Sequence, residues 1–445
     1  MPGKAQAAPA LRQAVEYGFT RSPAESLLYR VHAKLTHGKP TGTMSKPTSK
    51  PKPTPHSAGL VIFALAMGAF AIGTTEFATM SLLPYFAKDL HIDAPTAGHV
   101  ISAYALGVVV GAPILTVLAA RVARRTLLLW LMALFALFNG LCAFAPTYEW
   151  LLVLRFLSGL PHGAYFGIAS LVAVSLVPLN KRNQAVGRMF LGLTIATIIG
   201  VPFANWLGHA IGWRWGFGLV ALVGLLTVAL VAWLAPHTPA SPGSSPLREL
   251  SALKHGQVWL TLAIGAIGFG GMFAVYTYLA DTLLQVTQVS PATVPFVLGI
   301  FGVGMTIGSI VVPWFADRAL MPTAAGLLLW STAASALFTV TAGNIWGISI
   351  TVFLIGMGGA LGTVLQTRLM DVAKHAQGLA AALNHSAFNF ANALGPLLGG
   401  MAIARGYGWT SPGWVGALLA LGGFVLLLVS MWLDRADRTR MGKPN

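Results

Sequence analysis

The sequence predicts an all-α integral membrane protein with twelve transmembrane helices arranged in two six-helix halves. Hydrophobic residues make up 56% of the 445 residues and charged residues 9%, with a mean hydropathy of +0.72. Soluble domains are nearer 45–50% apolar and about 25% charged. Twelve apolar runs are long enough to cross a bilayer, and short landmarks repeat about 197 positions apart. Composition, span number and repeat therefore agree on one class of fold.

The apolar runs give the predicted elements in chain order. A spanning helix needs about 20 apolar residues. No run alternates like a strand, and only helices or closed barrels satisfy their backbone groups in lipid. The predicted spans are Leu60–Pro84, Ala97–Ala120, Leu127–Pro146, Trp150–Pro178, Met189–Ile211, Gly216–Ala235, Val258–Ala280, Val294–Phe315, Thr323–Ala342, Trp346–Gln366, Leu379–Ala404 and Trp414–Leu433.

The basic residues between the spans predict their orientation. Loops after odd-numbered spans contain three basic residues, Lys88, Arg214 and Arg405, whereas loops after even-numbered spans contain eleven. Because Lys and Arg are retained in cytoplasmic loops, we expect both termini on the cytoplasmic side and the first helix to run outward. The eleven are Arg121, Arg124, Arg125, Lys181, Arg182, Arg188, Arg248, Lys254, Arg318, Arg368 and Lys374.

The net charge of +16 arises from basic residues in the predicted cytoplasmic loops and tails. We therefore expect the chain to lie in a lipid bilayer and to bind no nucleic acid. The single cysteine, Cys142, lies in an apolar run. It excludes an intrachain disulfide, and an apolar environment disfavours the reactive thiolate.

The predicted domain boundaries follow the spans. Residues 1–58 form a basic, Pro-rich tail that is expected to be disordered, with no apolar core of a secretory signal. Two alternatives stay open for this tail: an amphipathic surface helix over Leu11–Leu35, or translation that begins at Met44. A six-helix half over residues 59–236 follows, then a cytoplasmic linker over 237–257, a second half over 258–433 and a cytoplasmic tail over 434–445.

An internal repeat relates the two halves. The segments Phe156–Gly159 and Phe353–Gly356 lie 197 positions apart, as do Arg121 and Arg318, and Gly200 precedes Gly395 by 195. A repeat of six spans keeps the halves in one orientation, related by an axis along the membrane normal. Proteins built this way bind substrate near midplane between the halves and rock one half against the other.

Two formal charges lie inside the predicted spans, Glu76 in the first and Arg155 in the fourth. A rise of 1.5 Å per residue puts them about 12 Å and about 8 Å below the outer ends of their spans. Charge at membrane depth is costly and marks functional sites. A direct or water-bridged pair is one prediction. The alternatives are that Glu76 positions a helix by hydrogen bonding, and that Arg155 shapes a cavity.

Several polar residues inside the spans are weaker predictions for lining a central cavity. They can instead bond helix to helix, at about 0.6 kcal/mol each. We find no motif for a metal, a cofactor or a phosphate-binding loop. The predicted cavity residues are Tyr104, His162, Tyr165, Asn384, His385 and Asn389.

Three motifs resemble those of the major facilitator superfamily. Thr116–Arg125, TVLAARVARR, is similar to the family loop G-x-L-A-D-R-x-G-R-R/K, with Ala120 in place of the acid. The second copy, Trp314–Arg318, keeps its acid at Asp317. In the fourth span, LLVLRFLSG resembles L-x-x-x-R-x-x-Q-G, and in the fifth, the segment around Gly200 and Pro202 approximates an antiporter motif.

The segments GTTEF at Gly73–Phe77 and PHGAY at Pro161–Tyr165 resemble the bacterial sugar-efflux, arabinose-efflux-permease-like group and the related twelve-span drug:proton antiporters. The resemblance covers Leu60 to Leu433. It implies the major facilitator fold, no cofactor, no enzyme activity and a bacterial inner membrane location. It also implies gating loops that contain Arg121, Arg124, Arg125, Asp317 and Arg318.

The resemblance further implies secondary transport by alternating access, with proton-coupled export of a drug, sugar or metabolite by a monomer. Glu76 and Arg155 are the predicted proton-coupling residues, with the proton and a cationic or polar substrate competing for the Glu76 carboxylate. An importer or uniporter of sugars and, less favoured, a polytopic membrane enzyme are the alternatives.

Overall fold

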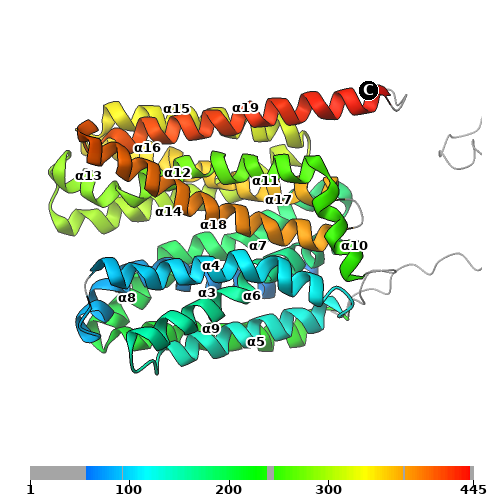
Figure 1. The fold of residues 1–445 in the computed structure, drawn as a ribbon, viewed down its shortest axis with the longest axis horizontal. Coiled ribbons are helices and arrows are strands. Elements are labelled where there is room, and N and C mark those ends of the chain that lie inside the picture. The colour runs from blue at the N-terminus through cyan, green and yellow to red at the C-terminus, as the bar shows by residue number, and fades with distance from the viewer. Residues whose placement is uncertain (1–56, 93, 238–244, 374–375, 441–445) are drawn as a thin grey trace, which may run out of the picture. The chain divides into compact units, whose positions relative to one another are not determined.

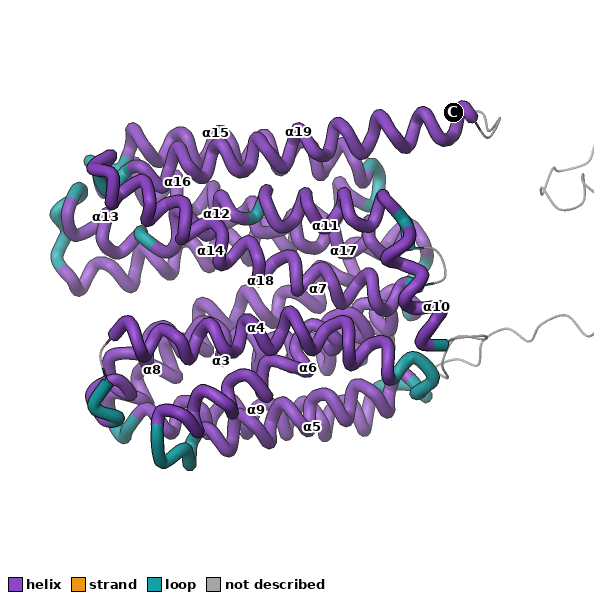
Figure 2. The backbone as a smooth tube through the Cα atoms, in the orientation of Figure 1, coloured by secondary structure: helices purple, strands orange, loops and turns teal. Residues whose placement is uncertain are grey.

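The computed structural model describes residues 57–92, 94–237, 245–373 and 376–440, and within these ranges it contains helices and no strand (Figure 2). Twelve helices in these ranges are long and apolar enough to cross a membrane, which confirms the predicted fold class. The predicted disorder, the surface helix over Leu11–Leu35 and the alternative start at Met44 lie outside the described residues.

The first six spans are formed by helices α3 to α9. The fifth span is the most irregular, because a π-helical turn interrupts it before Pro202. The elements are α3 (Ala58–Asp89), α4 (Ala94–Leu118), α5 (Arg124–Cys142), α6 (Tyr148–Ser175), η1 (Leu179–Lys181), α7 (Arg182–Ile195), η2 (Ala196–Gly200), α8 (Val201–Ala210) and α9 (Trp213–Leu234).

The predicted linker contains two short helices, and six further spans follow it. The elements are α10 (Pro246–Leu250), η3 (Ser251–Lys254), α11 (Gly256–Gly268), α12 (Gly270–Thr277), α13 (Leu279–Gln285), η4 (Pro291–Thr293), α14 (Val294–Ala316), α15 (Leu320–Thr341), α16 (Ile345–Met357), η5 (Gly358–Ala360), α17 (Leu361–Val372), α18 (Gln377–Ala402), η6 (Ile403–Tyr407) and α19 (Ser411–Arg440).

The helices pack as two groups, which we call the N-terminal group, α3–α9, and the C-terminal group, α11–α19. Within the first, α4 packs on α6 and α5 on α9, and within the second, α14 packs on α16 and α15 on α19. Figure 1 shows the blue-to-green N-terminal group beside the green-to-red C-terminal group. The groups meet where α18 contacts α4 and α6, and where α7 contacts α14.

The sequence repeat reappears in this packing. At the crossing of α4 and α6, any side chain on Gly107 would collide with the carbonyl oxygen of Phe156. At the crossing of α14 and α16, Gly304 stands against Phe353 in the same way. Both residues of the second pair lie 197 positions after those of the first. The repeated glycines therefore lie at two equivalent helix crossings. At each crossing the backbones approach so closely that only a residue without a side chain fits.

Several helices extend beyond the predicted spans. Helix α3 continues past Pro84 to Asp89, because Phe86 is buried against Trp213 and Asp89 accepts a hydrogen bond of 3.0 Å from the Trp213 indole. The tenth span reaches Val372 and α19 reaches Arg440. Apolar windows end at the first charges, whereas a helix ends where its packing and capping end.

Candidate functional site

Glu76 lies deep in α3 with no partner for its carboxylate. Its side chain is 3% exposed, and neither carboxylate oxygen has a hydrogen-bond partner among the described residues. It is 13 residues before the end of α3 at Asp89, or about 20 Å along the helix axis. The membrane span of α3 ends at Leu83, so the extension to Asp89 leaves Glu76 at its predicted depth in the outer half of the membrane.

Arg155 of α6 binds Thr75, the residue that precedes Glu76 in α3. Its Nη1 donates to the hydroxyl of Thr75 at 2.9 Å, and that hydroxyl donates to Oδ1 of Asn139 at 2.7 Å. The guanidinium lies 4.2 Å from the ring centroid of Tyr104, a cation–π contact. The described residues contain no ion pair between Glu76 and Arg155. The predicted direct pair is absent because Thr75 and Tyr104 hold the guanidinium.

A chain of polar side chains runs from Arg155 to the C-terminal group, and we call it the buried polar chain. The Tyr104 hydroxyl lies 3.0 Å from Nδ1 of His162. The His162 ring faces that of His385 in α18, with centroids 5.2 Å apart, and His385 stacks on Phe166 at 4.1 Å. Nε2 of His162 and both ring nitrogens of His385 have no hydrogen-bond partner within the described ranges.

A cavity of about 800 Å³ lies between the two groups, in the half of the membrane that the sequence predicts to be outer. Residues of α3, α4, α12 and α18 form most of its wall, with one residue each from α8, α13 and α14, and no charged residue is among the described lining residues. Its polar groups include Ser81, Ser102, Tyr276, Asn389 and Asn392. The site therefore offers apolar surface with hydroxyl and carboxamide groups.

Of the predicted cavity residues, Asn389 lies in this wall, and Asn384 and His385 line a smaller cavity of about 30 Å³ between the two groups. Tyr104, His162, Tyr165 and Asn384 are buried, because α6 packs directly against α4 and α18 at their depth. Tyr165 donates to the carbonyl of Leu65 at 2.9 Å and Asn384 to that of Gly362 at 3.3 Å. These two bond helix to helix. Glu76 is also absent from the described lining, although its neighbour Phe77 belongs to it.

The opposite side of the bundle, the predicted cytoplasmic side, is closed by contacts between the groups. Asp317 accepts hydrogen bonds from the backbone and side chain of Asn183 at 2.7 and 2.9 Å, and from the backbone of Gln184 at 3.2 Å. Arg182 and Asp371 form an ion pair at 2.7 Å. These contacts join α7 to the C-terminal group.

Of the other predicted gating residues, Arg125 binds the end of the sixth span and Arg318 binds the helix that precedes it, α14. Arg121 is exposed and Arg124 is half-buried. Arg125 donates to His237 and to the carbonyl of Ala232, and Arg318 donates to the carbonyl of Trp314 at 2.7 Å.

The antiporter-like segment packs against α3 at Thr74. Gly200 ends the π-helical turn of the fifth span and Pro202 begins α8. A side chain on Gly200 would collide with the hydroxyl of Thr74, two positions before Glu76. The glycine therefore lets the fifth span approach α3 at the Thr74-Thr75-Glu76 segment.

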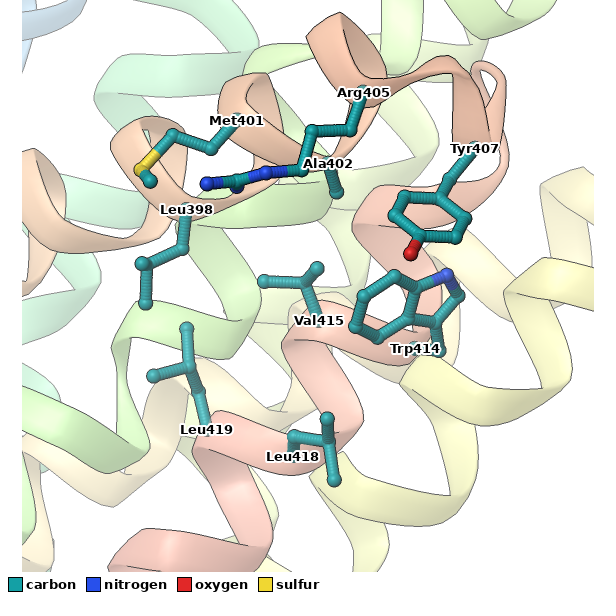
Figure 3. Close-up of a pocket in the computed structure, with 9 residues that line it drawn as sticks. All are labelled: Leu398, Met401, Ala402, Arg405, Tyr407, Trp414, Val415, Leu418 and Leu419. Carbon is teal, nitrogen blue, oxygen red and sulfur yellow. The ribbon is translucent and has the colours of Figure 1, made fainter.

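A second cavity, of about 300 Å³, lies at the junction of α18, η6 and α19 (Figure 3). Tyr407 stands edge-on to Trp414 with ring centroids 5.8 Å apart, and the Arg405 side chain extends toward Met401 and Leu398. Aromatic rings with a basic residue at the end of a span are typical of the membrane–water interface. We therefore separate this cavity from the candidate site.

The sequence predicts Asn139, a carboxamide in the third apolar run, as a residue that bonds helix to helix, and it accepts a hydrogen bond from Thr75 of α3. The pairing of His162 with His385 was not predicted. The two histidines lie in opposite halves of the chain, so no local pattern joins them. Within the described ranges there is no cluster of three His, Cys, Asp or Glu residues that could hold a metal ion.

Comparisons with known proteins agree with this geometry. A family model described as Major Facilitator Superfamily matches residues 65–327 and 282–443. The chain is 42% identical to the Inner membrane transport protein YdhP of Escherichia coli (strain K12) over 379 residues, covering 85% of this chain and 97% of that protein.

Two further matches have known or proposed transport roles. The chain is 30% identical to a Probable sugar efflux transporter of Helicobacter pylori (strain ATCC 700392 / 26695), with 81% of this chain and 92% of that protein covered. The crystal structure of the human organic anion transporter MFSD10 superposes with a TM-score of 0.66 at 14% identity, and covers 83% of this chain and 98% of that one.

Proposed function

Because the chain belongs to the major facilitator superfamily, whose members are transporters and not enzymes, we propose that it exports an uncharged small molecule in exchange for protons. The observation that carries this proposal is Glu76, a buried carboxyl with no hydrogen-bond partner among the described residues, next in sequence to Phe77 in the wall of an uncharged cavity. The similarity to a protein named as a probable sugar efflux transporter supports export as the direction.

Glu76 is the proposed proton-binding group. A charged carboxylate without partners in an apolar interior costs several kcal/mol, so binding and release of a proton there depend on whether water reaches the group. Arg155 is fixed close by through Thr75. Movement of α6 against α3 changes the distance between this cation and Glu76. The charge on Glu76 is thereby linked to the relative position of the two helices.

The cavity supports an uncharged, amphipathic substrate. Its described lining is aromatic and aliphatic, with hydroxyl and carboxamide groups that can fix an orientation. A charged substrate would lose its hydration there without gaining a charged partner. Because Glu76 is outside this lining, the predicted competition of substrate and proton for one carboxylate has no support in this conformation. We propose that the two are coupled indirectly, through the helices that both contact.

The arrangement also supports alternating access in the inner membrane with both termini in the cytoplasm. In that predicted orientation the large cavity faces outward, while Asp317 and the Arg182–Asp371 pair close the inner side. Export then requires the opposite state, in which these inner contacts part and the outer ends of α3, α4, α12 and α18 come together.

The test replaces Glu76 in a reconstituted system. A screen in an efflux-deficient host, with sugars, phenicols, amino-acid derivatives and cationic dyes as probes, first selects an exported compound, and we expect an uncharged one. In proteoliposomes, Glu76→Gln should lower transport driven by an imposed pH gradient by about a hundredfold or more, the size typical of a lost proton-transfer group. Exchange of labelled for unlabelled compound without a gradient should persist.

The matched control is Glu149→Gln, because Glu149 is an exposed acid at the start of α6. It should transport as the wild type does. Undiminished gradient-driven transport by Glu76→Gln would exclude Glu76 as the proton-binding group. Export of the cationic dyes alone would contradict an uncharged substrate.

A further inference from the structure

The predicted cytoplasmic side contains two junctions that the internal repeat makes equivalent. In the first, Asp317 follows α14 and accepts a hydrogen bond of 3.2 Å from the backbone of Gln184 in the first turn of α7. An acid near a helix N-terminus satisfies its free N–H groups and its dipole. Asp317 thereby ties the C-terminal group to the fifth span.

The second junction lacks the corresponding acid. The residue 197 positions before Asp317 is Ala120, and a methyl group accepts no hydrogen bond. The eleventh span, α18, begins at Gln377, and α7 begins at Arg182, 195 positions earlier. Gly200 and Gly395 have the same spacing. On this alignment the backbone N–H that corresponds to that of Gln184 belongs to Leu379.

A carboxylate from another element occupies that place. Oε2 of Glu249, in the linker helix α10, accepts a hydrogen bond of 2.8 Å from the backbone N–H of Leu379. A side-chain carbon on the preceding residue, Gly378, would lie 3.2 Å from the same oxygen. Glu249 therefore caps the start of α18 as Asp317 caps the start of α7.

The linker is also anchored by apolar packing. Ala252 of η3 is buried in one cluster with Leu379 and Ala380 of α18, and Val117 of α4 packs against that cluster. Helix α10 contacts both α4 and α18, and Figure 1 shows it at the end of the bundle where α4 ends and α18 begins. The linker thus joins the N-terminal group to the C-terminal group at this junction.

We propose that Glu249 is a positioning residue for transport, which replaces the acid missing at position 120 and holds the predicted cytoplasmic gate closed in the outward-facing state. The gate here means the two caps, Asp317 on α7 and Glu249 on α18. The role of this gate in transport rests on the proposed function, whereas the closure of the gate by Glu249 does not. In this proposal the linker connects the halves and also forms a part of the gate.

The electrostatic surroundings predict which substitutions matter. Burial raises the pKa of Glu249, although the Leu379 N–H, Arg124 and Arg248 act in the opposite direction. A neutral acceptor of the same shape should therefore be tolerated. We expect Glu249→Gln to keep the cap through its side-chain carbonyl, and Glu249→Ala to lose it.

The test measures opening of the gate directly. Ser170 of α6 is fully buried and accepts a hydrogen bond of 3.0 Å from Gln366 of α17, across the closed interface. Ser170→Cys should therefore react with N-ethylmaleimide only when that interface opens. In nanodiscs, adding Glu249→Ala should raise its labelling rate by about tenfold, the effect of losing one hydrogen bond to a carboxylate.

Three further variants separate a gate from a merely structural role. Ala120→Asp together with Glu249→Ala should restore slow labelling, because it returns the acid to its repeat-equivalent position. Asp317→Ala should raise the labelling rate as Glu249→Ala does, and Asp281→Ala, an exposed acid at the other end of the bundle, should not. Protein without Ser170→Cys reports the background from Cys142, which is fully buried.

The proposal is overturned if Glu249→Ala leaves labelling slow while Asp317→Ala accelerates it. If Glu249→Gln and Glu249→Ala raise the labelling rate equally, a neutral side chain of the same shape does not preserve the cap on α18. That result would contradict the expectation that Glu249→Gln is tolerated. None of these rates requires a transported compound. The gate can therefore fail this test while proton-coupled export stands, or the reverse.

Discussion

Arg155 shows how single residues accommodate a charge inside the bundle. It is 1% exposed, yet it has a hydroxyl partner in Thr75 and an aromatic face in Tyr104. The sequence predicted Glu76 and Arg155 because charges in apolar runs are conspicuous. It gave no indication of Thr75 or Asn139 as partners, because Thr and Asn in an apolar run also occur as ordinary helix-packing residues.

A matched pair of tyrosines tests the buried polar chain. Tyr104→Phe keeps the ring under Arg155 but removes the hydroxyl that meets His162. We expect a loss of about 1 kcal/mol in the free energy of unfolding, since a buried ring nitrogen of His162 loses its hydrogen-bond partner. Gradient-driven transport should also fall, because the link between Arg155 and the histidines is broken. Thermal unfolding in detergent and proteoliposome transport measure the two effects.

Tyr165→Phe is the control for this pair. Tyr165 lies in the same helix as His162 and is buried like Tyr104. Its substitution removes one hydrogen bond, the one to the carbonyl of Leu65. It should show a similar loss of stability with transport retained. Equal transport by both phenylalanine variants would mean that the buried polar chain serves packing alone.

At the scale of elements, α3 and α9 are joined outside the membrane by a polar contact. Asp89, the last residue of α3, accepts hydrogen bonds from Arg214 and from the indole of Trp213 at the start of α9. The hydrogen bond from Arg214, and then that from Trp213, hold the pKa of Asp89 below its ordinary value of 3.8. This contact explains why α3 continues beyond the apolar window that predicted its end at Pro84.

This contact predicts a pH dependence of stability. Because the pKa of Asp89 is lowered on folding, its carboxylate contributes stability above about pH 4, and that contribution disappears as the pH falls through the lowered value. Asp89→Asn should therefore lower Tm at pH 7 by only about 1–2 °C, since the pair is exposed to solvent. The difference from wild type should shrink as the pH falls below about 4.

Thermal scans in detergent from pH 7 to pH 3 measure this difference. The control is Asp281→Asn, an exposed acid on the same predicted side, which should match wild type throughout. A difference for Asp89→Asn that grows as the pH falls would contradict the lowered pKa of Asp89.

At the scale of the whole molecule, the fold was largely predictable and the interface between the groups was not. Hydropathy located the twelve spans because every helix that crosses the bilayer needs a long run of apolar residues. Contacts such as His162 with His385, Asp317 with Gln184, and Glu249 with Leu379 join residues more than a hundred positions apart. Their local sequences give no indication of these pairings. The short helices of the linker contain too few residues to show the apolar periodicity of a helix.

The predicted domain boundaries lead to a test by fragment complementation. A chain divided after residue 240 leaves α10 and its cap on α18 within one polypeptide. We expect co-expressed fragments 1–240 and 241–445 to assemble and to retain measurable transport, because α4, α6 and α7 contact α18 and α14 extensively without the connection. Co-purification through a tag on one fragment, followed by the transport assay, measures the outcome.

Division after Lys254 is the comparison, since it moves α10 and η3 to the other fragment. The cap on α18 then has to form between separate chains, and we expect less assembled protein. Failure of the first pair to assemble while the second pair succeeds would contradict the boundary drawn through the linker.

The length of α3 also has an electrical consequence. Glu76 lies 7 residues below Leu83, the outer end of the 26-residue membrane span of this helix, so a proton that reaches it from outside crosses roughly a third of the bilayer. A full elementary charge crossing 100 mV gains about 2.3 kcal/mol. Loading of Glu76 should then draw about 0.8 kcal/mol from the membrane potential per 100 mV. An exporter built on this helix would respond to voltage even at equal pH on both sides.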